Sequence, residues 1–136
     1  MFVTLIYGVL DIASGAFTYC NCGHNPPLVV RTDGRSERLT LTGLPLGVLP
    51  EADYATREIV LGPGDRLVLY TDGVTEASTE DGAEFGEARL EAAIDALRQG
   101  TPLAMVDGIV ERVDAFAAGA PQADDITCLA LVYAAP

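Results

Sequence analysis

The chain has 136 residues and a formal net charge of −12, from 20 acidic and 8 basic residues. Hydrophobic residues make up 49% of it, which is enough for a folded core and argues against global disorder. The negative charge disfavours nucleic acid and anionic membranes as partners. Three cysteines form no secreted disulfide pattern, so we expect a reducing, cytoplasmic setting.

The N-terminal segment is apolar and mixes β-branched and aromatic residues. Residues 2–10 show no polar face, which predicts a strand buried on both sides. The segment meets Asp11 far short of the ~20 apolar residues needed to span a bilayer. After a turn at residues 11–15, residues 16–22 resume as a strand and predict a hairpin with the first.

Further short strands and turns follow in the next part of the chain. The expected strands are residues 28–31, 37–41, 56–61 and 66–70, with a loop at 43–47 against the core. We expect the last two of these strands to pair with each other. The turn between them, residues 62–65, contains the proline and glycines that supply a bend.

Two helices and one strand complete the expected elements. A helical apolar stripe predicts a helix over residues 86–98. A second is expected over residues 102–117, with Thr101 as its N-cap and Pro102 in its first turn. Residues 126–133 form the last strand, so the fold class is α+β.

Acidic residues lie at the ends of two expected strands. Asp72 follows the apolar strand 66–70, and Asp124 and Asp125 precede the last strand. If these strands are neighbours, their carboxylates converge. At ~4 Å and an effective dielectric of ~20, two like charges repel by roughly 4 kcal/mol, and a hard cation removes that penalty. Oxygen ligands favour magnesium or manganese over zinc.

The same residues also have an ordinary interpretation. Asp72-Gly73 is then a simple turn, and Asp124-Asp125 is a solvated approach to a strand. Spacing alone favours this interpretation over a metal site. The Cys20-Asn21-Cys22-Gly23-His24 segment lacks a second ligand pair with zinc-like spacing, so we expect His24 to order its loop.

Several ordered motifs together carry a family resemblance. They are residues 21–28 (NCGHNPPL), 43–47 (GLPLG), 70–77 (YTDGVTEA), 85–86 (FG) and 124–127 (DDIT). In this order they resemble the C-terminal half of PPM-type, metal-dependent serine/threonine phosphatases. The most similar branch is the bacterial one related to stage II sporulation protein E and to regulators of stress sigma factors.

The resemblance implies a fold, an activity and a partner. The fold is an αββα sandwich of the PPM phosphatase type, incomplete at its N-terminus, with residues 1–136 as the C-terminal portion of a single phosphatase domain. The activity is hydrolysis of phosphoserine or phosphothreonine on a protein. The implied substrate is a phosphorylated anti-sigma factor antagonist in a partner-switching pathway.

The resemblance also implies the site. Asp72 and Asp124 match two metal-ligand positions, and Asp125 is a further candidate that acts through water or shapes the site. No other side chain is assigned a catalytic role. The cofactor is Mg²⁺ or Mn²⁺ in a two-metal site. Members of the resembled family carry an earlier Asp-Gly metal motif, which has no counterpart in this chain. The two-metal site is therefore expected to need residues from outside this chain.

Two alternatives remain open at this stage. In the first alternative, the chain is an inactive fragment or binding module that recognises a switch protein without turnover. In the other alternative it only self-associates, because unpaired strand edges pair with other chains.

Overall fold

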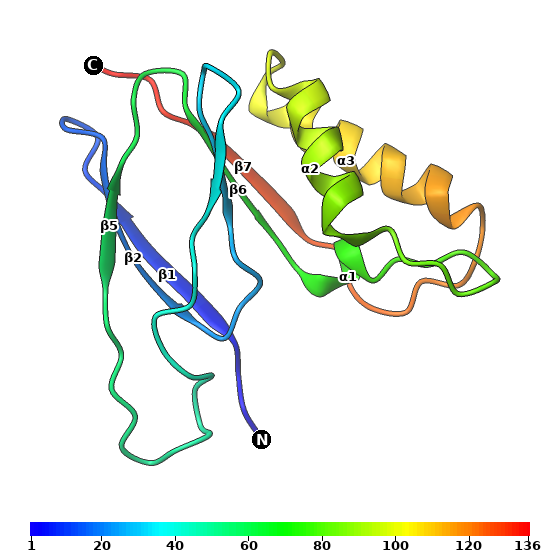
Figure 1. The fold of residues 1–136 in the computed structure, drawn as a ribbon, viewed down its shortest axis with the longest axis horizontal. Coiled ribbons are helices and arrows are strands. Elements are labelled where there is room, and N and C mark those ends of the chain that lie inside the picture. The colour runs from blue at the N-terminus through cyan, green and yellow to red at the C-terminus, as the bar shows by residue number, and fades with distance from the viewer. The chain divides into compact units, whose positions relative to one another are not determined.

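The computed structural model describes all 136 residues and contains seven strands and three helices (Figure 1). The elements are β1 (Leu5–Leu10), β2 (Ala16–Cys22), β3 (Leu28–Val30), β4 (Ser36–Arg38), β5 (Arg57–Val60), β6 (Arg66–Tyr70), α1 (Asp72–Thr75), α2 (Gly86–Leu97), α3 (Pro102–Ala117) and β7 (Cys128–Val132). The chain divides into two compact units. The first is Met1–Leu67 with Val132–Pro136, and the second is Val68–Leu131. None of the helices has the length and apolar character required to cross a bilayer.

A three-stranded sheet in the order β1-β2-β5 belongs to the first unit. The predicted β1–β2 hairpin is confirmed: the strands are antiparallel, with Leu5 opposite Cys22 and Leu10 opposite Phe17. The alternation along β2 buries Phe17 and Tyr19, whose rings stack with their centroids 6.1 Å apart. The inward side of this hairpin is therefore part of the core.

The prediction that the first strand is buried on both faces is wrong, because one face of β1 is exposed. Leu5, Tyr7 and Val9 share one face because side chains alternate along a strand, and they are 41%, 64% and 55% exposed. β1 is also an edge strand, paired only with β2. The apolar composition of this segment predicted a strand correctly but did not predict how it is covered.

The second sheet has the strand order β4-β3-β6-β7. It corrects the prediction that the strands now seen as β5 and β6 pair with each other. β5 instead pairs with β2, and Leu61 N–H donates to the carbonyl of Gly15 at 2.9 Å. Beyond the turn, the backbones of Asp65 and Tyr133 hydrogen-bond, so the start of β6 lies beside the end of β7. The turn at residues 62–65 therefore connects two sheets.

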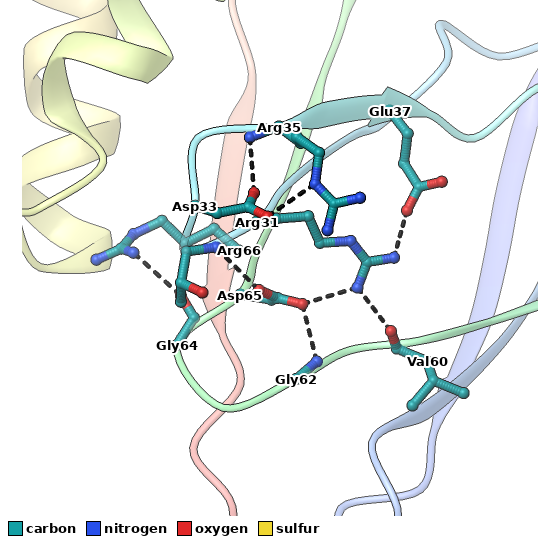
Figure 2. A network of polar contacts seen from close by, with 10 residues as sticks. Arg31, Asp33, Arg35, Glu37, Val60, Gly62, Gly64, Asp65 and Arg66 are labelled. Atoms are coloured by element: carbon teal, nitrogen blue, oxygen red, sulfur yellow. Dashed lines mark hydrogen bonds and ion pairs between the residues drawn. The ribbon is translucent and has the colours of Figure 1, made fainter.

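A buried carboxylate holds this turn in place (Figure 2). Asp65 accepts hydrogen bonds from Gly62 N–H at 2.8 Å, Thr32 N–H at 3.1 Å and Arg31 Nη1 at 2.7 Å. Arg31 also pairs with Glu37. Burial alone raises the pKa of Asp65, but these donors outweigh it and hold the pKa below its ordinary value. Asp65 is thus a structural residue.

In the second unit, α2 and α3 pack side by side (Figure 1). Both helices were predicted. Thr101 caps α3 by accepting from Ala104 N–H, and Pro102 occupies its first turn. The two helices bury the apolar residues Leu90, Ala93, Ile94, Met105, Ile109 and Val113. The chain therefore contains both strands and helices with buried apolar side chains, as the predicted α+β class requires.

Candidate active site

Asp72 begins the four-residue helix α1, directly after β6. The buried residues Gly73, Val74 and Thr75 anchor this helix, whereas Asp72 itself is exposed. One Asp72 carboxylate oxygen, Oδ1, accepts from Gly73 N–H at 3.0 Å. The rigid end of β6 therefore presents this carboxylate to solvent. The helix α1 was not predicted.

Asp124 and Asp125 lie in the loop that leads from α3 to β7, and both are exposed. Asp124 Oδ1 accepts from Asp125 N–H at 2.7 Å, and its carbonyl accepts from Gln122 Nε2 at 2.7 Å. These contacts order the loop just before β7. β7 pairs with β6, so the strands that adjoin these acidic segments are neighbours, which is the condition under which their carboxylates were expected to converge.

Thr71 fixes the two acidic segments against each other. Its hydroxyl donates to the Asp125 carbonyl at 2.8 Å and accepts from Thr127 N–H at 3.0 Å. The Thr71 N–H also donates to the Thr127 carbonyl at 3.0 Å. One side chain therefore sets the register between the segment of Asp72 and the segment of Asp124.

Gly73 shows how close this approach is. A Cβ atom at this position would lie 2.3 Å from the Asp125 carbonyl oxygen and 3.1 Å from that of Asp124. Such a contact cannot be accommodated without a backbone shift, so only glycine fits here. The Asp-Gly sequence thus has a steric cause: the aspartate faces solvent while the glycine admits the neighbouring loop.

The structure brings together the backbones that carry Asp72, Asp124 and Asp125. No ion pair joins any of these three carboxylates to a basic side chain. Across the whole chain, no three His, Cys, Asp or Glu side chains are grouped so that they could hold a metal ion. The segments are therefore adjacent, without a complete set of ligands from this chain.

A cavity of about 230 Å³ opens beside Asp124, entirely within the second unit. Its acidic lining residues are Asp124, Glu76 and Asp114, while Asp72 and Asp125 do not line it. Asp114 was not among the residues predicted to form the site. Helical spacing was the sequence signal that could have identified it. Asp114 follows the buried Val113 on α3 and lies three residues before Ala117, and Val113 and Ala117 also line the cavity.

The histidine and cysteine segment has a different arrangement. His24 N–H donates to Asn21 Oδ1 at 2.9 Å, and the His24 ring lies 3.3 Å from Thr4 Oγ1. The Cys20 and Cys22 sulfurs are 3.3 Å apart, and burial raises the pKa of Cys22 to about 11. The Asn21 side chain therefore holds the backbone of this loop, the His24 ring contacts Thr4, and Cys22 remains a protonated thiol near neutral pH.

A known family matches nearly the whole chain. The sequence profile of stage II sporulation protein E (SpoIIE) covers residues 1–133. The chain belongs to the SpoIIE family. This result confirms the predicted PPM-type phosphatase relationship.

Individual relatives agree with this membership. The SpoIIE-family chain is 34% identical over 131 residues to protein IcfG of Synechocystis sp., covering 96% of this chain and 20% of IcfG. It is 37% identical over 83 residues to phosphoserine phosphatase RsbU of Bacillus subtilis, covering 60% of this chain and 25% of RsbU. The chain thus spans a quarter or less of each relative's length.

A solved structure supports the fold. The phosphatase domain of the cell fate determinant SpoIIE from Bacillus subtilis, presoaked in manganese, matches with a TM-score of 0.75 and 19% identity. The match covers 96% of the chain described here and 56% of the solved SpoIIE chain. The fold is therefore that of part of a PPM-type phosphatase domain, as predicted.

Proposed function

We propose that this chain contributes metal-binding residues to a protein phosphatase that hydrolyses phosphoserine or phosphothreonine. The observation that carries the proposal is the Thr71 bridge, which holds the Asp72 segment against Asp124 and Asp125. Family membership supplies the reaction class. The relative RsbU is named a phosphoserine phosphatase, which supports a phosphorylated protein as the substrate.

Asp72 and Asp124 are the proposed ligands of Mg²⁺ or Mn²⁺. Their carboxylates are hard oxygen donors, they are exposed, and neither is neutralised by a basic side chain. They therefore fit a divalent cation by donor chemistry, although a full ligand set needs further residues. Divalent cations at such a site supply charge neutralisation for the phosphoryl group and activate the attacking water.

The chain's own residues contribute positioning. Thr71 and Gly73 set the spacing between the two ligand segments, and Val74 anchors α1 in the core. Asp125 is proposed to act through a water molecule or to shape the site. The backbone carbonyl of Asp125 accepts the hydrogen bond from the Thr71 hydroxyl. Asp125 is exposed, so its carboxylate is available to a water molecule. Correct placement of such groups accounts for a large part of catalysis.

The finer parts of the proposal concern the pathway. We infer that the substrate is an anti-sigma factor antagonist in a partner-switching pathway and that the protein acts in the cytoplasm. The resemblance to the branch of sigma-factor regulators supports both statements. We also infer that residues 1–136 are the C-terminal portion of a single phosphatase domain, supported by the 56% coverage of the solved SpoIIE chain.

The test uses the full-length gene product that contains residues 1–136. It measures Mn²⁺-dependent phosphate release from a phosphoserine peptide, before and after Asp124→Asn. The expected result is release that requires Mn²⁺ and is lost in the variant. Asp107→Asn, an exposed acid on α3, is the matched control and should keep full activity. Tight binding of the phosphoprotein without any release would instead favour a binding module.

A further inference from the structure

The cavity beside Asp124 has the size of a site for one side chain. Its volume of about 230 Å³ lies below the ~300–1,000 Å³ of typical small-molecule sites. Most of its lining residues are small or apolar, including Val113, Ala117 and Ile126. Val113, which lies on α3, is buried and forms part of the hydrophobic core. The cavity therefore offers an apolar wall to an inserted group.

The charge of the lining selects the kind of group. Glu76, Asp114 and Asp124 line the cavity, and no Lys, Arg or His does. Neither Glu76 nor Asp114 forms an ion pair within the chain. A cavity with an apolar wall and uncompensated carboxylates is complementary to a long side chain that ends in a positive charge. Lysine and arginine have this character, since their aliphatic stems pack on apolar surface while the charge stays solvated or paired.

The cavity is next to the proposed reaction site. Glu76 caps α1, and its N–H donates to the carbonyl of Asp72 at 2.8 Å. Asp124 lines the cavity itself. A divalent cation is a poorer occupant, because the three acidic side chains are not grouped as metal ligands. A substrate side chain bound in the cavity would therefore come from a residue only a few positions away, in the substrate sequence, from the phosphorylated residue at the site.

We propose that this cavity is a specificity pocket that receives a lysine or arginine of the phosphoprotein, near the phosphorylated residue in the substrate sequence. The proposal rests on the proposed phosphatase function. Glu76 and Asp114 bind the positive charge, and Val113, Ala117 and Ile126 contact the aliphatic stem. Basic residues around the phosphoserine would then raise the rate through Glu76 and Asp114, neither of which is a proposed metal ligand.

The test is a set of phosphoserine peptides that carry one lysine at successive positions from −4 to +4, each paired with a norleucine peptide. Norleucine keeps the aliphatic stem and removes the charge. For the full-length gene product, we expect kcat/KM to be about 10-fold higher for lysine at one or two positions, which corresponds to about 1.4 kcal/mol. Asp114→Asn should reduce this ratio to about 3 or less, and Asp114→Lys should abolish or reverse it.

Glu111→Gln is the matched control, because Glu111 lies one turn earlier on α3, is exposed and does not line the cavity. It should keep the lysine-to-norleucine ratio. Binding of the unphosphorylated peptides, followed by fluorescence anisotropy, provides a readout that does not need turnover. Hydrolysis with equal ratios for all peptides would overturn the pocket and leave the phosphatase function standing. Lysine-dependent binding that is lost in Asp114→Lys, with no hydrolysis, would overturn the function and support the pocket.

Discussion

Asp65 and Asp72 are seven residues apart, each adjoins a glycine, and their environments are opposite. Asp65 is 5% exposed and takes bonds from Arg31 and from two backbone N–H groups. Asp72 is exposed and has no basic partner. A carboxylate whose charge is satisfied within the fold stabilises structure, whereas one that is rigidly held and unsatisfied is available for a ligand.

The largest effect is expected on activity when Asp72 is changed. Asp72→Asn in the full-length gene product should lower kcat/KM for a phosphoserine peptide by at least about 100-fold, because a metal ligand is lost. Its free energy of unfolding should change by less than about 0.5 kcal/mol, as is usual at an exposed site. Full activity of the variant would contradict the functional role of Asp72.

The reverse pattern is expected at Asp65. Asp65→Asn should lower the free energy of unfolding by about 2–3 kcal/mol, because it leaves Arg31 without its buried partner. Urea unfolding of the chain measures this loss. Asp33→Asn, which removes an exposed partner of Arg35, should cost less. An Asp65 variant as stable as the wild type would show that the network in Figure 2 adds nothing to stability.

Gly73→Ala is expected to affect both properties. The added Cβ meets the Asp125 carbonyl at 2.3 Å, so the loop must move and the free energy of unfolding should fall by about 1–3 kcal/mol. Activity should fall with it, since Asp124 moves as well. Gly62→Ala is the control, because its Cβ would have only an ordinary contact of 3.5 Å. Equal effects of the two variants would contradict the close approach at Gly73.

A pH titration of stability sharpens the contrast further. The folded-state pKa of Asp65 is lowered, so its stabilising contribution is present above its unfolded value of about 3.9 and is lost as the pH falls through the folded pKa. The stability difference between wild type and Asp65→Asn should therefore be constant above about pH 5 and shrink below about pH 4. A difference that stays constant to pH 2 would refute the lowered pKa.

The smallest effect is expected at the exposed face of β1. The isolated chain of residues 1–136 should self-associate through Leu5, Tyr7 and Val9, because these apolar side chains lie on an edge strand. Tyr7→Ser combined with Val9→Thr should shift the average mass in light scattering towards the monomer. A monodisperse wild-type monomer would exclude this association.

Local chemistry made part of the fold predictable. Thr101 and Pro102 mark the start of α3 because a cap and a first-turn proline act within a few residues. The pairing of β5 with β2 could not be predicted, because it depends on contacts about 40 residues apart, such as Phe17 opposite Ile59. The meeting of the Asp72 and Asp124 segments was implied by the family resemblance, whereas the residues alone made it conditional on β6 and β7 being neighbours. The cavity was not, because it forms only when α1, α3 and the loop before β7 come together.

Mn²⁺ binding by the full-length gene product tests whether Asp72 and Asp124 serve one site. Electron paramagnetic resonance of free Mn²⁺ gives the affinity for wild type, Asp72→Asn, Asp124→Asn and the double variant. Two ligands of a shared site predict that each single change weakens binding by at least about 10-fold and that the double change adds less than the sum of the two. Unchanged Mn²⁺ affinity in both single variants would show that these aspartates do not hold a metal.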